Sequence, residues 1–163
     1  MHLTLKKYQK TNFKDFDKCM VGLQEFLVKI DPLKRTRKGP KYSPKYALNL
    51  VEEIKKYNGT IFLAYDDKKV VACIAGIMEK QSKNNLLECV PTRAGRILEL
   101  FVEKDYRSHG IGQKLMEKME NYFQKKHCNL IRIEVFEPNK IAHNFYKKLD
   151  YGDRIVDMIK ILK

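Results

Sequence analysis

The chain has 163 residues, of which 44% are hydrophobic and 33% charged, and it carries a formal net charge of +13 at pH 7. This composition is typical of a globular protein with a sizeable core and excludes wholesale disorder. No apolar run approaches the ~20 residues that cross a bilayer, so we expect one domain over residues 1–163 and no membrane partner.

The positive charge has several interpretations: a nucleic acid, an anionic ligand, or a lysine-rich solvated surface. The lysines are spread along the whole chain, which favours the solvated surface, and the densest basic stretch is residues 33–42. A nucleic-acid-binding protein presents a basic recognition helix or surface aromatic residues. Most aromatic residues here occupy core-facing helical positions, so we do not expect a nucleic-acid partner.

The cysteines and histidines, four of each, are scattered along the chain without a C-x-x-C pair. This spacing argues against a structural zinc site, and we expect no metal. The amino-terminal stretch MHLTLKKYQK contains no apolar segment followed by a small-residue cleavage site. We therefore expect a cytoplasmic protein whose cysteines are free thiols.

Hydrophobic periodicity and turn residues predict an alternation of strands and helices. In the amino-terminal half, we expect a strand at 2–8, a helix at 13–30, a helix at 43–58, a hairpin of strands at 60–65 and 69–78, and a loop at 80–95. In the carboxyl-terminal half, we expect a strand at 96–104, a helix at 111–123, a strand at 129–136, a short helix from 138 and a strand at 154–162.

The stretch YRSHGIGQKLM (106–116) places Gly110 and Gly112 between a predicted strand and a predicted helix. Unpaired N–H groups at a helix amino terminus bind phosphate, and glycine lets a pyrophosphate approach the backbone, while Arg107 adds a cation. A glycine turn that only lets the helix pack tightly on the strand explains the spacing equally well.

Two stretches together, ELFVEKDYRSHGIGQKLM and EPNKIAHNFYKKLDYG, closely resemble two linked motifs of the GCN5-related N-acetyltransferase (GNAT) superfamily. The second motif is represented by Asn139, Ala142, Phe145, Tyr146, Leu149, Tyr151 and Gly152, with the last pair inverted relative to the usual Gly-aromatic order. The resemblance implies an α/β (α+β) GNAT-type acyl-CoA N-acyltransferase fold, in which about four helices flank a mixed sheet of about six to seven strands. It also implies transfer of the acetyl group of acetyl-CoA directly to a primary amine of a small molecule or protein.

The resemblance assigns roles to individual positions. The residues implied to bind CoA are Leu100, Phe101 and Val102 along the pantetheine arm, Arg107, Ser108, His109, Gly110, Ile111, Gly112 and Gln113 at the pyrophosphate, and Asn139 and Tyr146. Tyr146 is implied to protonate the leaving thiolate, and a phenol with a pKa of ~10 keeps a proton to donate at neutral pH. Core packing beside Phe145 is the alternative role for this tyrosine.

Glu99 is the candidate general base. Strand alternation predicts that Leu98, Leu100 and Val102 share one face, so that Glu99 lies on the other face with Ile97 and Phe101. An alkylammonium with a pKa of ~10.4 must lose a proton before it attacks, and a carboxylate accepts that proton directly or through water. A salt-bridged or solvated glutamate is the alternative interpretation, and Glu134 and Glu137 are weaker candidates.

The acceptor is expected to be selected by segments outside the motifs, at 31–45 and 80–95 and near the carboxyl terminus. The basic stretch at 33–42 disfavours a polycationic acceptor and suits one that carries a carboxylate or phosphate. A catalytically silent acyl-CoA-binding regulator would share the same cofactor motifs, so it remains the main alternative. A homodimer is retained among the expected oligomeric states.

Overall fold

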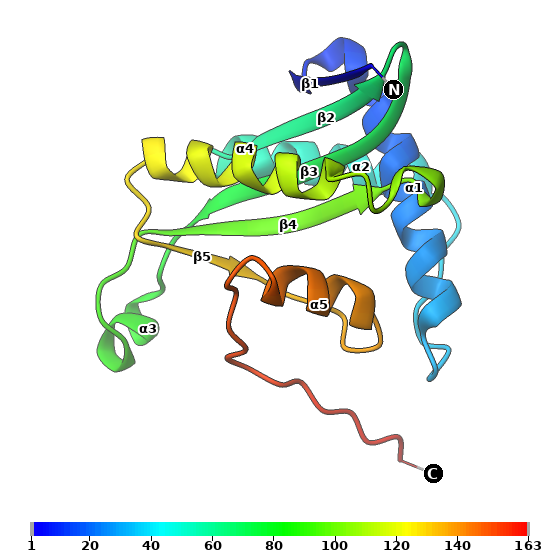
Figure 1. Cartoon of the computed structure of the whole chain (residues 1–163). Coiled ribbons are helices and arrows are strands. Elements are labelled where there is room, and N and C mark those ends of the chain that lie inside the picture. Colours follow the sequence, from blue (N-terminus) through cyan, green and yellow to red (C-terminus); the bar gives the residue numbers. More distant parts are fainter. Residues whose placement is uncertain (1, 163) are drawn as a thin grey trace.

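The structure, a computed structural model, describes residues 2–162 and contains one mixed sheet of five strands in the order β1-β2-β3-β4-β5 (Figure 1). The strands are β1 (Leu3–Lys7), β2 (Thr60–Asp66), β3 (Lys69–Glu79), β4 (Ala94–Val102) and β5 (Leu130–Ile133). The first four are antiparallel to their neighbours, whereas β5 is parallel to β4.

Helices cover both faces of this sheet. Helices α1 (Phe13–Ile30) and α2 (Tyr42–Lys56) pack on one face, and α4 (Ile111–Lys125) and α5 (Lys140–Lys147) pack on the other. A short helix, α3 (Lys83–Glu88), follows β3. Two 3-10 turns, Lys10–Asn12 and Lys104–Tyr106, precede α1 and follow β4.

The central strands β2 and β3 are buried over nearly their whole length because helices lie above and below them. Such strands have continuous apolar sequences instead of alternating ones, as in TIFLAY and VVACIAGIM. The apolar stripes of α1 and α4 complete the two cores, with Phe16 and Met20 on one side of the sheet and Leu115 and Phe123 on the other. Each helix thus buries the face that its periodicity predicts.

The predicted α/β class is confirmed, but the predicted number of elements is wrong: residues 2–162 form five strands and five α-helices. The segment 154–162, predicted to be a strand, is extended but pairs with no strand. Helix α3 lies inside the predicted loop at 80–95, where the Ser82 hydroxyl caps it by accepting from the Asn85 N–H at 3.0 Å. Its six residues are too few to show a helical period.

No helix within residues 2–162 has both the length and the apolar character needed to cross a membrane.

Candidate functional site

Strand β4 loses one of its two neighbours halfway along its length. Its first residues, Ala94–Ile97, pair with β5, whereas among residues 2–162 the only partner of residues 99–102 is β3 on the opposite side. Figure 1 shows β4 and β5 together at their amino ends and separated toward their carboxyl ends. The edge of β4 that faces away from β3 therefore offers the backbone hydrogen-bonding groups of alternate residues between 98 and 102, of which the Val102 carbonyl already accepts from Arg107.

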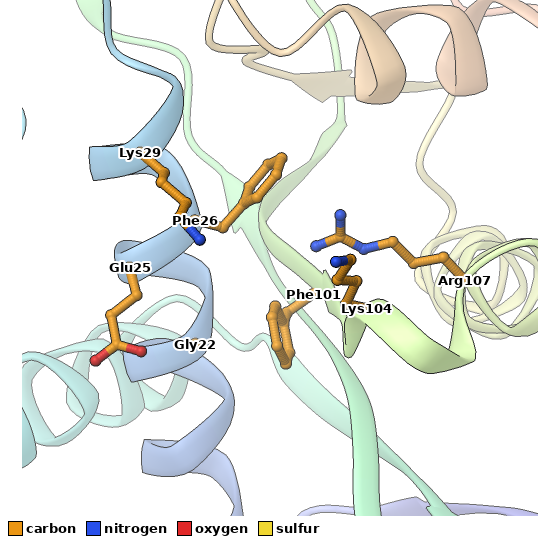
Figure 2. Close-up of a pocket in the computed structure, with 7 residues that line it drawn as sticks. All are labelled: Gly22, Glu25, Phe26, Lys29, Phe101, Lys104 and Arg107. Carbon is orange, nitrogen blue, oxygen red and sulfur yellow. The ribbon is translucent and has the colours of Figure 1, made fainter.

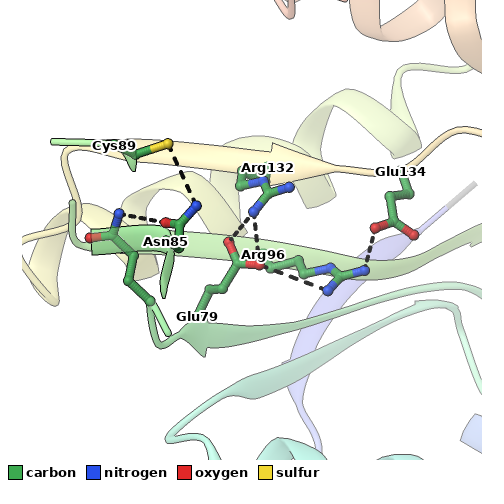
Figure 3. Close-up of polar contacts among 7 residues, drawn as sticks. Glu79, Asn85, Cys89, Arg96, Arg132 and Glu134 are labelled. Carbon is green, nitrogen blue, oxygen red and sulfur yellow. Dashed lines mark hydrogen bonds and ion pairs between the residues drawn. The ribbon is translucent and has the colours of Figure 1, made fainter. Parts of the chain in front are cut away.

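Ion pairs cross the part of the sheet where β4 and β5 remain paired (Figure 3). The Arg132 Nη1 on β5 donates to both carboxylate oxygens of Glu79 on β3, at 3.1 Å each. Arg96, on β4 between them, pairs with Glu79 and with Glu134. These contacts connect three strands immediately before the point at which β5 separates from β4.

The loop after β4 leads into α4 and exposes a row of backbone donors. The six consecutive amides of residues 108–113 have no hydrogen-bond acceptor among residues 2–162. The first amide of α4 that is paired is that of Lys114, which donates to the Gly110 carbonyl at 3.1 Å. Ser108 and Gly110 are in the left-handed region, with φ of 64° and 74°. Unpaired amides at a helix amino terminus form a binding site for an anion such as a phosphate.

Glycine is required at positions 110 and 112 of this loop for two different structural reasons. Gly110 adopts a left-handed conformation, and an added Cβ would meet no atom within 4 Å, so the space beside it is open. An added Cβ at Gly112 would lie 3.3 Å from the Phe145 ring and 3.8 Å from a Val102 methyl. Gly110 therefore suits the close approach of a ligand, and Gly112 lets α4 pack closely against α5.

Arg107 extends from the loop toward α1 instead of following the row of amides (Figure 2). Its Nε donates to the Val102 carbonyl at 3.1 Å, and its guanidinium lies 4.6 Å from the centre of the Phe26 ring. The cavity here, about 460 Å³, is also lined by Gly22, Glu25, Lys29, Phe101 and Lys104. His109 is exposed, and its Nδ1 lies 2.7 Å from the Arg107 carbonyl oxygen. The loop is thus flanked by positive charge.

A β-bulge in β4 changes the predicted orientation of Glu99. The register places Gly76 opposite Ile97 and Ala75 opposite Glu99, which leaves Leu98 as an extra residue. Ile97 consequently packs with Leu100 and Val102 on the side of α4 and α5, whereas Leu98 and Phe101 pack on the side of α1 and α2. The predictions that Ile97 shares a face with Glu99 and that Leu98 shares one with Leu100 and Val102 are therefore wrong, because strict alternation fails at a bulge.

Tyrosines surround the Glu99 carboxylate. The Tyr46 hydroxyl on α2 donates to Glu99 Oε1, and the Tyr42 ring stacks on the Tyr46 ring at 4.9 Å with an interplanar angle of 12°. Burial raises the pKa of the Glu99 carboxyl, and the hydrogen bond from Tyr46 opposes this shift. Sequence analysis missed both tyrosines, because only the packing of α2 against the sheet brings them to β4.

Tyr146 approaches Glu99 from the other side of the sheet. It lies on α5, is 7% exposed, and packs edge to face against Phe145 and Tyr151 at 5.2 and 6.0 Å. Burial and then the negative charge of Glu99 raise the pKa of the Tyr146 phenol, which therefore retains its proton at neutral pH. The Tyr146 phenol on α5 and the Glu99 carboxylate on β4 thus influence each other electrostatically beside the part of β4 that has lost β5.

The other predicted positions lie around this centre. Asn139 caps α5, and its Oδ1 accepts from the Ala142 N–H at 3.2 Å, so any contact with a pantetheine arm would fall to Nδ2. Glu134 and Glu137 are exposed and paired with Arg96 and Lys140.

The turn after α5 depends on Asp150, which has a φ of 63°. The Tyr151 amide donates to the Tyr146 carbonyl at 3.1 Å, which closes this turn. Asp150, followed by the aromatic Tyr151, therefore takes the left-handed position that glycine favours at the end of a helix. The predicted inversion of the Gly-aromatic pair is better described as aspartate in place of glycine.

Comparison with known proteins agrees with this geometry. A family model described as the acetyltransferase (GNAT) family matches residues 26–151, and the chain belongs to this family. An uncharacterised N-acetyltransferase of Methanocaldococcus jannaschii is 34% identical over 99 residues, which are 60% of this chain and 56% of that protein. An N-alpha-acetyltransferase of Sulfurisphaera tokodaii is 30% identical over 116 residues, 69% of this chain and 65% of the relative. The chain thus aligns with less than two thirds of the length of each of these two relatives.

Solved structures share the fold at low sequence identity. The BH1408 protein of Bacillus halodurans superposes with a TM-score of 0.85 at 17% identity, covering 98% of this chain and 99% of its own. The aminoglycoside N-acetyltransferase AAC(6')-Iy in complex with CoA has a TM-score of 0.72 at 15% identity, covering 98% and 95%. The GNAT-like fold is confirmed, with five strands in residues 2–162 in place of the predicted six to seven.

Proposed function

We propose that the protein is an N-acetyltransferase that transfers the acetyl group of acetyl-CoA to a primary amine. One observation carries the proposal: the six unpaired amides of residues 108–113 lie next to a strand, β4, whose edge is free along residues 98–102. These two features suit a ligand with a pyrophosphate and an amide-containing arm, because the first binds anions and the second adds backbone hydrogen bonds to an extended chain.

The residues fit CoA in a definite order along this path. The amides from Ser108 to Gln113 would hold the pyrophosphate, with Arg107 adding positive charge. The backbone of Leu100, Phe101 and Val102 and the side chain of Asn139 would hold the pantetheine arm. This order brings the thioester toward Glu99 and Tyr146. CoA-bound AAC(6')-Iy, which has a similar fold, supports the assignment.

The chemistry is a direct acyl transfer. Glu99 accepts a proton from the acceptor ammonium, and its raised pKa makes it a stronger base than an exposed carboxylate. The neutral amine nitrogen attacks the thioester carbonyl carbon, so that a C–N bond forms and the C–S bond breaks. Tyr146 donates its phenolic proton to the departing thiolate sulfur, and the resulting phenolate takes the second proton from the nitrogen of the new amide through water. Glu99 releases the first proton to solvent, so that one proton is released overall. Tyr46 orients Glu99 through the hydrogen bond to Oε1.

The rings around Glu99 favour a cationic acceptor. The Tyr46 hydroxyl donates to the Glu99 carboxylate, the Tyr42 ring stacks on the Tyr46 ring, and the charge of Glu99 contributes to the raised pKa of Tyr42, Tyr46 and Tyr146. Aromatic faces beside a carboxylate attract an alkylammonium ion. The relatives named as N-acetyltransferases are consistent with an amine acceptor.

The four free cysteines fit a reducing compartment, and we propose the cytoplasm, with residues 1–163 acting as one domain.

A panel of primary amines, incubated with acetyl-CoA while free thiol is recorded, tests the proposal. We expect at least one amine to release CoA thiol well above the rate of hydrolysis measured without an amine. Calorimetry with CoA separates the two alternatives: tight CoA binding without turnover of any amine in a broad panel would favour a silent regulator. Absence of CoA binding by the folded protein would contradict both.

A further inference from the structure

The loop between α1 and α2, residues 31–41 and here called the basic loop, concentrates positive charge. It carries five basic side chains, all of them exposed: Lys34, Arg35, Arg37, Lys38 and Lys41. Among the described residues 2–162, an ion pair engages only one of these five, Lys38, which contacts Glu25 on α1. The other four side chains have no carboxylate partner within that range and are available to an anionic group.

Backbone contacts give the basic loop its shape. Asp31 is 8% exposed, and its carboxylate accepts from three amides of the loop: Leu33 at 2.9 Å, Arg35 at 2.8 Å and Thr36 at 2.6 Å. The Gln24 Nε2 on α1 donates to the Arg37 carbonyl at 2.8 Å. These bonds involve the backbones of Arg35 and Arg37 but not their guanidinium groups. Either guanidinium can therefore be removed without loss of the contacts that build the loop.

Two lysines of the loop adopt a backbone conformation that lysine disfavours. Lys34 and Lys41 have φ of 53° and 63°, in the left-handed region that glycine and asparagine adopt more readily. Lys41 also occupies the amino-terminal cap of α2, where its side chain makes no capping hydrogen bond. Serine, threonine, aspartate and asparagine stabilise that position better. Lysine at two positions where it costs stability indicates a segment that binds a ligand.

The basic loop ends next to the residues that surround the Glu99 carboxylate. Lys41 is followed directly by Tyr42, whose ring stacks on that of Tyr46. Tyr46 in turn donates to Glu99, and burial and then the negative charge of Glu99 raise the pKa of the Tyr42 phenol. Figure 1 shows the loop at the end of α1, on the side of the molecule toward which β4 runs. An amine at Glu99 therefore has the cations of the loop beyond the Tyr42 ring.

We propose that the basic loop binds an anionic group, a phosphate or a carboxylate, of a small acceptor whose ammonium group lies at Glu99. The inference rests on the proposed acetyl transfer and names its substrate class, a zwitterionic primary amine. The two ends of such an acceptor meet opposite charges, and the guanidinium groups of Arg35 and Arg37 suit the paired oxygens of either anion. A reversed acceptor would place like charges together, so the charges also fix the orientation of the amine.

Matched pairs of amines test the preference with the full chain and acetyl-CoA. The pairs are phosphoethanolamine with ethanolamine, γ-aminobutyrate with its amide, and ε-aminocaproate with its amide. We expect kcat/KM to be about tenfold or more higher for the anionic member of at least one pair, since charge-assisted hydrogen bonds are among the stronger polar contacts. A preference confined to the first pair would identify phosphate as the anion, and one confined to the other two would identify carboxylate.

The double variant Arg35→Gln/Arg37→Gln tests the assignment to the loop. We expect the KM of the preferred anionic amine to rise about tenfold or more, with little change in kcat or in the KM of acetyl-CoA. The matched control is Lys55→Gln/Lys56→Gln, which removes the same charge from the other end of α2 and is expected to keep the wild-type KM. Calorimetry of phosphoethanolamine and ε-aminocaproate on the CoA-saturated protein measures the same preference without turnover.

The outcomes separate this inference from the acetyl transfer on which it rests. Equal kcat/KM for the charged and neutral members of every pair would overturn the inference and leave the transfer intact. A rise in the KM of acetyl-CoA in the loop variant, with the acceptor KM unchanged, would assign the loop to the cofactor and also overturn it. If no amine is acetylated, the proposed function fails, and absence of calorimetric binding of both anionic amines to the folded CoA complex would overturn the inference as well.

Discussion

The two halves of β4 are a few residues apart in one strand, yet their surroundings differ. In Ala94–Ile97, which lies between β3 and β5, three of four residues are buried, and Arg96 is held in ion pairs. In residues 98–102, every residue is partly exposed, and within the described residues 2–162 the only neighbouring strand is β3. The separation of β5 thus converts a structural strand into one that can receive a ligand.

The bulge at Leu98 lies at the boundary between these halves. It lets Glu99 point toward α2, while Leu100 and Val102 pack toward α4 and α5. Bulges commonly re-aim side chains next to functional sites. If this comparison is correct, substitutions around residues 98–102, the open half of β4, will change catalysis. Substitutions around Ala94–Ile97, the half paired with β5, will change only stability.

The largest effect is expected for Tyr146→Phe, which keeps the ring packing and removes the proton donor. Loss of a general acid lowers kcat by ~10²–10⁴-fold, while the Kd for acetyl-CoA changes little. The matched control is Tyr151→Phe, because Tyr151 packs on Tyr146 but its hydroxyl donates to Glu120 instead. Near-wild-type turnover of Tyr146→Phe, with chemistry rate-limiting, would mean that solvent protonates the thiolate.

Glu99→Gln is expected to lower kcat/KM by about 10²-fold at neutral pH. The loss should shrink as the pH rises toward ~10.4, because a free amine no longer needs a base. Tyr46→Phe, which removes the hydrogen bond to Glu99, is expected to shift the acidic limb of the pH–rate profile upward, since that hydrogen bond lowers the pKa of Glu99. A pH-independent loss in Glu99→Gln would show that Glu99 is not the base.

Glu99→Gln, which is expected to lower activity, is expected to raise stability at neutral pH. The folded-state pKa of Glu99 is raised, so its contribution to stability is full at pH values below the unfolded-state pKa of ~4.3 and is lost as the pH rises through the folded-state pKa. At neutral pH, Glu99→Gln removes this cost, and we expect its Tm to exceed that of the wild type. The Tm difference should narrow on acidification, which thermal unfolding at several pH values will measure.

Gly110→Val is expected to weaken CoA binding at least tenfold, or about 1.4 kcal/mol, because a branched side chain blocks the approach of phosphate to the loop amides. Because position 110 has a left-handed φ, valine there will also destabilise the fold by ~1–2 kcal/mol relative to glycine. Gly39→Val, in an exposed loop with open space around the Cα, is the control. Unchanged CoA affinity by calorimetry in folded Gly110→Val would refute the loop assignment.

The smallest effect is expected in the paired half. Arg132→Ala removes the donor to Glu79 from a partly exposed pair, so we expect a loss of about 0.5–1 kcal/mol in the free energy of unfolding and no change in kcat. Urea denaturation and the amine assay measure the two quantities. A large fall in kcat would show that the paired half of β4 and β5 also affects catalysis, and would contradict the comparison.

Much of the fold was predictable because its signals are local. The apolar stripes of α1 and α4, the turn residues of the β2–β3 hairpin and the glycine-containing loop all appear within short stretches. The bulge was not predictable, because alternation in LELFV reads equally well without an extra residue at 98. Neither were the roles of Tyr42 and Tyr46, which depend on how α2 packs over β4.

The sequence by itself therefore determined the order of the elements through residue 147, α3 excepted, and the family motifs, since each depends on the period or chemistry of neighbouring residues. Tertiary structure decided which edge of β4 is free, which way Glu99 points and that residues 154–162 have no partner strand within residues 2–162. The physical reason is that strand pairing and burial join groups far apart in the chain. A pattern such as RIVDMIKIL indicates that a strand can form, but its hydrogen bonds require another strand, which local sequence cannot specify.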